Sequence, residues 1–280
     1  MKKEKIKIYC PDRERVLGIG AIVWEMFQEL LESRELVWRL FKRDFLAKYR
    51  QSLLGVTWAF IIPIVTVGLF VFLKSAGVMQ MKESTVPYPL YSLVGLTIWQ
   101  IFGSGVLLSS QSLIGAGDLI SKINLPMVAI VSASFLETLV EFLIRSLLVL
   151  LLFVYYGIFP SEGLLFFPLT LIPIYLLMMG VGLLFSIMNV ILRDVGKITT
   201  YFVLLLMFAT PVLYPIPETA QWFFLWNPFT YLVNAPRDLL FEGSLTHNTA
   251  YLSTTIFSVL FFMASWVFFH IVEKRVPERI

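Results

Sequence analysis

The stretch that decides the fold is residues 84–117, which read STVPYPLYSLVGLTIWQIFGSGVLLSSQSLIGAG. These 34 consecutive residues contain no Asp, Glu, Lys or Arg. A helix that crosses a bilayer needs about 20 mainly apolar residues, because the hydrocarbon core is ~30 Å thick and each helical residue rises ~1.5 Å. The run therefore predicts a transmembrane helix at residues 88–110.

The rest of the chain has the same character. Of its 280 residues 58% are hydrophobic and 15% are charged, whereas a soluble domain has roughly 45–50% and about 25%. Further apolar runs predict spans at residues 53–73, 127–157, 164–191, 198–213 and 247–271. We therefore expect an all-α integral membrane protein with six transmembrane helices over residues 53–272.

The distribution of Lys and Arg predicts the orientation of these spans, because basic residues collect on the cytoplasmic side. With a cytoplasmic N-terminus, that side carries 18 of the 22 basic side chains and the opposite side carries three, which are Lys74, Lys82 and Arg237. Six spans place both termini on one side. We therefore expect residues 1–32 and 273–280 to be cytoplasmic tails.

Several classes of function are excluded or disfavoured by composition. A single cysteine, Cys10, permits no internal disulfide. The two histidines, His247 and His270, are far apart in the sequence, so we expect no metal site. The net charge of +3 is too small to indicate a nucleic-acid partner. Residues 1–50 lack the apolar core and small-residue cleavage site of a signal peptide, so none is expected.

Residues 33–52 have the pattern of an amphipathic helix. Leu36, Val37, Leu40, Phe41 and Phe45 recur at helical spacing and form one apolar stripe. Basic side chains crowd the other faces, which predicts an interface helix attracted to anionic lipid. The residues assigned to this role are Arg39, Lys42, Arg43, Asp44, Tyr49 and Arg50. An ordinary solvated helix packed on a partner domain is the alternative.

Residues 214–236 are apolar and aromatic but are interrupted by Pro215, Pro217, Pro228 and Pro236. Proline inside a helix removes a donor and clashes with the preceding turn, and each remaining piece is too short to cross a bilayer. The pattern predicts a re-entrant hairpin on the outer side, between spans five and six, that turns at Asn227-Pro228. Non-helical backbone at this depth must be satisfied by protein or water, so we expect the hairpin to line a cavity or gate.

Glu137, Glu141 and Arg145 are charges within the predicted third span. Their spacing of four residues places them along one helical face, and their cost in lipid requires that this face points to protein or water. Glu141 and Arg145 can pair, which leaves Glu137 in need of another partner or of a proton. We expect a structural pair, and a substrate or proton role is the alternative.

Five ordered motifs resemble those of polysaccharide-export ABC permeases, the membrane subunits that export O-antigen, teichoic acid or capsule chains. The first is residues 40–63, LFKRDFLAKYRQSLLGVTWAFIIP, and the second is residues 91–102, YSLVGLTIWQIF. The others are residues 119–126, LISKINLP, residues 189–195, NVILRDV, and residues 209–215, ATPVLYP, which are followed by Asn227-Pro228. Each motif alone is weak, but the ordered set covers about residues 33–240.

The resemblance implies a permease of the bacterial cytoplasmic (inner) membrane that exports a lipid-linked glycan. It implies two copies of this chain and two copies of a separate ATPase, which binds ATP and Mg²⁺, with no cofactor in this chain. The sequence agrees, because it contains no Gly-x-x-x-x-Gly-Lys-Ser/Thr motif. By resemblance, the turn that couples to the ATPase comprises Asp118, Leu119, Ile120, Ser121, Lys122, Ile123 and Asn124.

Aromatic rings are expected to line the channel, because sugar rings pack their C–H faces on aromatic planes and weak, repeated sites let a chain enter and leave. The candidates for the channel or gate are Tyr88, Tyr91, Trp99, Phe102, Tyr201, Phe202, Tyr214, Trp222, Phe223, Phe224, Trp226, Phe229 and Tyr231. The alternative for each ring is lipid contact or an interfacial belt.

Two other functions fit parts of the sequence. An ABC permease for drugs or small lipids would share the six spans, but we would expect poorer agreement with the motif at residues 40–63. A membrane enzyme that acts on lipid-linked sugars would need a polar loop with converging Asp, Glu or His. The predicted outer loops carry scattered acidic residues instead, so we do not expect an enzyme.

Overall fold

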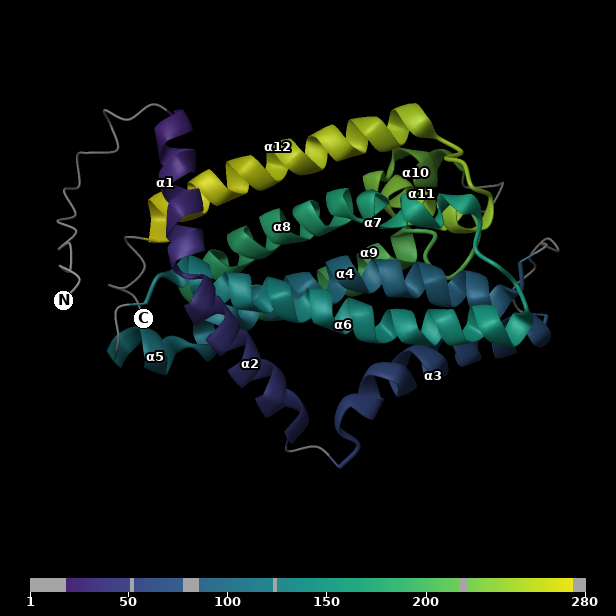
Figure 1. Cartoon of the computed structure of the whole chain (residues 1–280), viewed down its shortest axis with the longest axis horizontal. Helices are drawn as coiled ribbons and strands as arrows, with labels where there is room; N and C mark the ends of the chain where they lie inside the picture. The colour runs from purple at the N-terminus through teal and green to yellow at the C-terminus, as the bar shows by residue number, and fades with distance from the viewer. Residues whose placement is uncertain (1–18, 51–52, 78–85, 123–124, 217–220, 274–280) are drawn as a thin grey trace.

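The computed structural model describes residues 19–50, 53–77, 86–122, 125–216 and 221–273. Within these ranges the chain is helical, as predicted, and contains no strand (Figure 1). The longer helices are α1 (Ile19–Glu32), α2 (Arg34–Arg50), α3 (Trp58–Ser75), α4 (Tyr88–Gly115), α6 (Met127–Tyr156), α8 (Ile172–Ile191), α9 (Val195–Ala209), α11 (Pro228–Phe241) and α12 (Asn248–Glu273). The short ones are η2 (Gly55–Thr57), α5 (Gly117–Lys122), η3 (Glu162–Leu165), α7 (Phe167–Thr170) and α10 (Gln221–Trp226).

Five helical segments are long and apolar enough to cross a membrane: Gly55–Ser75, Tyr88–Gly115, Met127–Tyr156, Phe167–Ile191 and Asn248–Glu273. They correspond to five of the six predicted spans. The sixth, predicted at residues 198–213, is the 15-residue helix α9, which extends for about 22 Å at 1.5 Å per residue. The structure therefore contains five full-length candidate spans and one shorter apolar helix.

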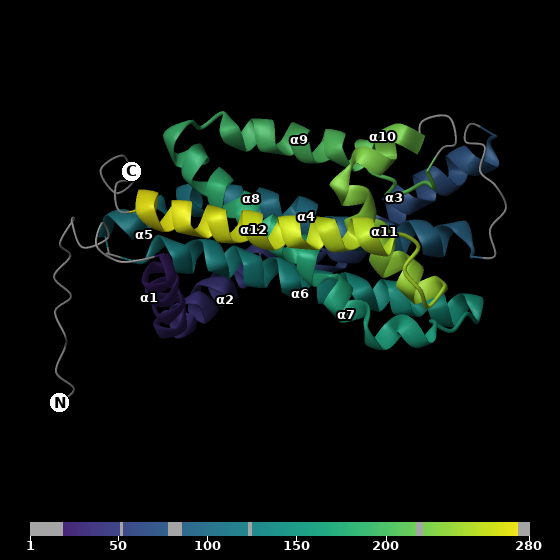
Figure 2. The same ribbon diagram turned by 90° about the horizontal axis from the view of Figure 1, so that it is seen from above.

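Helix α4 forms the centre of the bundle and packs against α3, α6, α8, α9 and α11. Figure 1 shows α8 and α12 on one side of α4, and Figure 2 shows α6 and α9 on opposite sides of it. Leu90, Phe102 and Val106 of α4 are completely buried. Small residues permit close approach to α8, since a Cβ at Gly182 would lie 2.3 Å from the Ser109 Oγ of α4.

The two ends of the bundle differ. Helix α5, helix α1 and the C-terminal end of α12 lie at one end, and α7, α10 and α11 lie at the other (Figures 1 and 2). Helices α10 and α11 meet at Asn227, where the hairpin turn was predicted. Helix α11 continues through Pro236 to Phe241, so it extends five residues beyond the predicted end of the hairpin.

The N-terminal helices lie outside the bundle core. Residues 19–32, which were assigned to a tail, form α1, which contacts α12, whereas residues 1–18 lie outside the described ranges. Helix α2 packs against α6 and makes a V with α3 (Figure 1). The predicted apolar stripe of α2 faces protein, because Leu40 and Phe41 are buried in the core cluster and Leu36, Val37 and Phe45 pack against it.

Candidate functional site

The backbone after α9 is unwound, and its sequence explains why. Pro211 has no N–H and would clash with the carbonyl group four residues earlier in a continuing helix. The residue before a proline is restricted to extended conformations, and Thr210 has φ −114° and ψ 140°. The helix therefore ends at Ala209, four residues before the predicted end of the fifth span.

Every carbonyl group from Leu206 to Leu213 nevertheless accepts a hydrogen bond. Two are satisfied by Thr210, whose Oγ1 donates to the Leu206 carbonyl and whose N–H donates to the Met207 carbonyl. The Thr210 carbonyl accepts from the Val212 N–H at 2.7 Å. The others accept from distant side chains or from Tyr214. An unsatisfied group in hydrocarbon costs several kcal/mol, so this set allows a break at membrane depth.

Three of these bonds fasten the break to the turn between α10 and α11 and to α4. Asn227 Nδ2 donates to the Ala209 carbonyl at 2.9 Å, while its Oδ1 accepts from the Phe229 N–H at 3.0 Å and caps α11. Tyr88 Oη and Ser92 Oγ of α4 donate to the Leu213 carbonyl at 2.8 and 3.1 Å. Tyr214 Oη donates to the Phe208 carbonyl.

Arg237 satisfies the two remaining carbonyls. Its Nη1 donates to the Pro211 carbonyl at 3.2 Å and its Nη2 to the Val212 carbonyl at 2.7 Å. The residue is 2% exposed. Sequence reasoning counted Arg237 as an outer-side charge and gave it no role. The sequence signal that could have identified it as a buried arginine is its position one residue after Pro236, inside an apolar aromatic stretch.

The predicted channel aromatics fall into two groups. Trp99 and Phe102 of α4 are buried and pack with Phe229 of α11, with the Phe102 and Phe229 ring centroids 4.6 Å apart. Tyr88 is also buried, and Tyr91, Tyr214 and Tyr231 are partly buried. In this conformation Trp99 and Phe102 contribute to the core of the subunit.

The second group is exposed on α9 and α10. Trp226 is 85% exposed and Trp222 is 69% exposed, and Tyr201, Phe202 and Phe223 are exposed as well. The side chain of Phe224 lies outside what the structure describes. Large apolar patches on a protein surface mark contact with lipid, with another protein or with a ligand, so these five rings remain candidates for the channel.

A charged cluster joins α2 to α6. Glu141 Oε2 accepts from Arg145 Nη2 at 2.7 Å, which is the pair expected from the sequence. Glu137, whose partner could not be assigned from sequence, accepts from Lys48 Nζ at 3.1 Å. Lys48 also pairs with Glu141, and Arg145 Nη1 donates to Ser104 Oγ at 3.4 Å. The two positive charges of Lys48 and Arg145 thus balance the two negative charges of Glu137 and Glu141.

This balance keeps Lys48 charged. Burial lowers the pKa of the Lys48 ammonium, but Glu141 and Glu137 together raise it by more, so the pKa lies above its usual value. Lys48 is 41% exposed, whereas Glu141 is 2% exposed. The cluster therefore ties the end of α2 to a buried position in α6, as a structural lock would.

The other residues assigned to the interface helix lie on its outer faces. Arg39 pairs with Glu35 at 2.7 Å and Arg43 pairs with Asp44 at 2.7 Å. Lys42 and Arg50 are exposed, and Tyr49 is partly buried. The outer faces of α2 are exposed and basic. They are compatible with both contacts predicted for this helix, a lipid surface and a partner domain.

The predicted coupling turn lies at the end of the bundle opposite α10 and α11 (Figure 1). Helix α5 follows α4 directly, and Leu119 and Ile120 pack against the core cluster. Asp118 and Lys122 are exposed. Ile123, Asn124 and the side chain of Ser121 lie outside the described parts of the chain.

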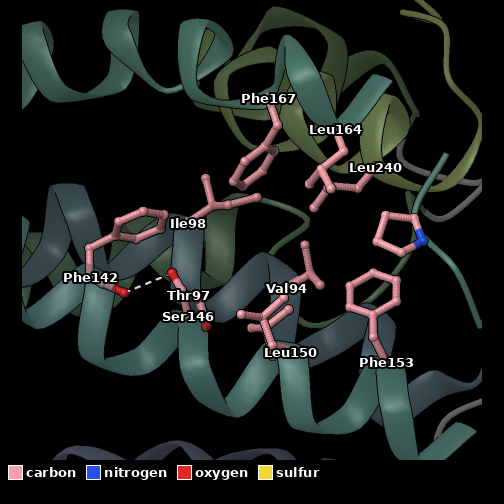
Figure 3. Close-up of a pocket in the computed structure, with 12 residues that line it drawn as sticks. Val94, Thr97, Ile98, Phe142, Ser146, Leu150, Phe153, Leu164, Phe167 and Leu240 are labelled. Atoms are coloured by element: carbon pink, nitrogen blue, oxygen red, sulfur yellow. Dashed lines mark hydrogen bonds between the residues drawn. The ribbon is translucent and has the colours of Figure 1, made fainter. Parts of the chain in front are cut away.

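A cavity of about 110 Å³ lies between α4, α6, α7 and α11 (Figure 3). Its wall is apolar and includes Val94, Ile98, Phe153 and Phe167. The Ser146 hydroxyl beside it donates to the Phe142 carbonyl at 2.8 Å. Thr97 is the other polar side chain of the lining, and two hydroxyls in an otherwise apolar wall do not supply the converging polar groups that a sugar needs, so we leave this cavity out of the candidate glycan path.

One cluster of potential metal ligands escaped the sequence analysis. His270 Nδ1 of α12 lies 3.0 Å from Glu273 Oε1 and 3.9 Å from Glu29 Oε2 of α1. Their ligand atoms all lie within 4.8 Å of one another. The two glutamates are 244 positions apart, so only the fold brings them together. The cluster joins α1 to α12.

These features define a multi-pass, all-α membrane protein with a broken helix at one end and a short turn helix at the other. The model of the ABC-2 type transporter family matches residues 35–241. The chain belongs to this family, whose members are transport subunits. It is accordingly a multi-pass protein of the inner membrane.

Several curated proteins are similar to the chain over most of its length. The O-antigen export system permease protein RfbA of Myxococcus xanthus is 26% identical over 260 residues, which cover 91% of this chain and 99% of that protein. The protein of the same name from Klebsiella pneumoniae is 27% identical, with 77% of this chain and 83% of that protein covered. The polysialic acid transport protein KpsM of Escherichia coli is 25% identical, with 75% and 83% covered.

Proposed function

We propose that this chain is the channel-forming permease subunit of an ABC transporter that exports a lipid-linked polysaccharide, of the O-antigen or teichoic acid type, across the cytoplasmic membrane. The observation that carries the proposal is the alignment with an O-antigen export permease over 91% of this chain and 99% of that relative. The similarity to a polysialic acid transport protein supports glycan as the cargo class.

Transport requires an energy source outside this chain. A charged glycan headgroup in hydrocarbon faces a large desolvation cost, and the sequence contains no Walker A motif. A separate ATPase, which binds ATP and Mg²⁺, supplies this energy. It acts on the end of the bundle that carries α5, and both termini of the permease lie on that cytoplasmic side.

Two copies of the chain enclose the channel, together with two ATPase subunits. The exposed rings of α9 and α10 are compatible with this arrangement, because they form apolar surface that one copy of the chain leaves uncovered. Tyr201, Trp222 and Trp226 then face the passage, where sugar rings stack weakly and repeatedly. The hairpin of α10 and α11 forms the outer gate.

Deletion of the gene in the native host tests the function. We expect surface polysaccharide to disappear while its lipid-linked form accumulates in the cytoplasmic leaflet, and we expect a plasmid copy to restore export. Normal surface glycan in the deletion strain would contradict the proposal. A deletion that left the glycan intact and changed only drug sensitivity would favour the alternative cargo.

A further inference from the structure

Arg237 stands where three segments that are distant in sequence meet. It belongs to α11, it donates to the Pro211 and Val212 carbonyls after α9, and its Cζ lies 4.0 Å from the ring centroid of Tyr91 on α4. A guanidinium over an aromatic face is attracted by the ring quadrupole. The Arg237 side chain therefore connects α11 to the unwound segment after α9 and to the central helix α4.

The site admits arginine and little else. A Cβ at Gly95 of α4 would lie 1.9 Å from Arg237 Nη2 and 2.2 Å from the Val212 carbonyl oxygen. The guanidinium thus occupies the space that the absent side chain leaves. Its planar fork reaches two successive carbonyls, which a lysine ammonium, as a single point charge, does not match.

The hydrogen bonds of the Arg237 guanidinium go to carbonyl and amide oxygens, and the Asp238 carboxylate interacts with it electrostatically. None of the ion pairs between described residues includes Arg237. The carbonyls that accept from it follow the C-terminal end of α9, where the helix dipole is negative and cations are favoured. A motion that separates α11 from this end therefore breaks two hydrogen bonds of a buried charge.

Helix α4 links this junction to the other end of the molecule. It runs from Tyr88 to Gly115 without interruption, which is about 42 Å at 1.5 Å per residue, and α5 begins at Gly117. Most of its residues are buried among α6, α8 and α9, so it transmits displacement as a rigid element. The Tyr91 end contacts Arg237, and the other end leads into the coupling turn.

We propose that Arg237 is the positioning residue that fastens the outer hairpin and the break after α9 to α4, so that displacement of α4 at its α5 end moves the hairpin. The role of the hairpin as a gate rests on the function proposed above. The fastening itself does not depend on the cargo.

Hydrogen exchange in the purified permease–ATPase complex tests the fastening without measuring transport. In Arg237→Met we expect the amides of residues 208–216 to exchange about tenfold faster or more, the factor that corresponds to loss of one charge-assisted hydrogen bond. Arg237→Lys should give an intermediate rate. Leu239→Ala, which removes a buried side chain from the same helix, should leave these amides near wild type.

Two results would overturn the fastening. One is unchanged exchange at residues 208–216 in Arg237→Met. The other is a uniform increase that includes α4 and α8, which would show a general loss of stability. A local increase in Leu239→Ala equal to that in Arg237→Met would also contradict a specific role.

The ratio of ATP hydrolysed to glycan exported tests the link to gating. We expect Arg237→Met to raise this ratio severalfold at equal amounts of assembled complex, with partial rescue in Arg237→Lys. An unchanged ratio would refute the role of Arg237 in gating. Failure of the proposed function would look different, because the wild-type complex itself would then move no glycan.

Discussion

Lys48 Nζ of α2 lies 3.1 Å from Glu137 Oε1 of α6, across 89 positions of sequence. The contact fixes the end of the N-terminal helix to a buried acid in a membrane span. With Glu141 and Arg145 it completes a neutral group of four charges. The relationship explains how acidic residues in an apolar span are compensated, and it makes the position of α2 dependent on α6.

Removal of the Lys48 charge should therefore destabilise the protein. Lys48→Met leaves Glu137 without its partner, and we expect a loss of about 1–3 kcal/mol, below the value for a fully buried pair because Lys48 is partly exposed. Lys48→Met combined with Glu137→Gln should recover part of this loss. Thermal unfolding in detergent measures both, and Arg43→Met, at an exposed pair, should change stability by less than about 0.5 kcal/mol.

Two results would reject the structural interpretation of this cluster. One is a Lys48→Met variant as stable as the wild type. The other is a Glu137→Gln variant that assembles normally but exports nothing, which would favour a substrate or proton role.

The same pair predicts how stability depends on pH. The pKa of Lys48 is raised above its ordinary value of 10.5, so its contribution is complete below 10.5 and declines as pH rises through the raised value. Between about pH 6 and pH 9, unfolding of the wild type and of the Lys48→Met/Glu137→Gln double variant, in which no acid loses its partner, should differ by a constant amount. A difference that changes across this range would show that another group titrates at the cluster.

A methyl group at Gly95 should disturb the junction around Arg237. Gly95→Ala places a Cβ 1.9 Å from Arg237 Nη2, and we expect a loss of about 1–3 kcal/mol from overpacking. Gly68→Ala in α3, where nothing lies within 4 Å of the added Cβ, should be neutral or stabilising by up to about 1 kcal/mol. Equal unfolding temperatures for the two variants would contradict the described packing.

Exposed rings on α10 should matter for export rather than for ATP hydrolysis. Replacement of Trp222, Phe223 and Trp226 by alanine should lower glycan export at least about tenfold, because stacking on one ring contributes about 1–3 kcal/mol. ATP hydrolysis should stay near wild type. Phe159→Ala removes a ring that is 91% exposed outside the hairpin and should leave export unchanged. Normal export in the triple variant would dismiss a role for these rings in the channel.

Crosslinking should place the ATPase at α5. A cysteine at Asp118 or Lys122, both exposed on the turn helix, should form crosslinks to the ATPase subunit in the assembled complex. A cysteine at Ser244, exposed near the hairpin end, should form none. Crosslinks from position 244 but not from positions 118 or 122 would contradict the proposal that the ATPase binds the α5 end of the bundle.

Apolar runs in the sequence were sufficient to predict most of the fold. Long, mainly apolar segments predicted the five full-length helices because bilayer thickness sets their length. The end of α9 was misplaced by four residues, although Pro211 was visible, because hydropathy continues through residues 210–213 without a break. The apolar stripe of α2 was recognised, but hydrophobic spacing alone does not distinguish a lipid surface from the protein surface that covers Leu40 and Phe41.

The site was less predictable, because its contacts join distant residues. The pair of Glu141 and Arg145 follows from helical spacing, whereas the Lys48 contact with Glu137 requires the fold. Arg237 and the carbonyls it binds are 25 and 26 positions apart, and nothing in local sequence pairs them. Trp99 and Phe102 were predicted to line the channel, which stays a prediction, and their burial against Phe229 depends on how α11 packs on α4.

Transport by purified components tests the central claim most directly. The chain and its ATPase should be reconstituted into liposomes with a lipid-linked glycan in the outer leaflet, where the ATPase faces the medium. We expect the glycan to become protected from an added glycosidase only when ATP is present, and not when the ATPase is omitted. Nucleotide hydrolysis by the permease chain alone, or no protection with the complete complex, would contradict the account.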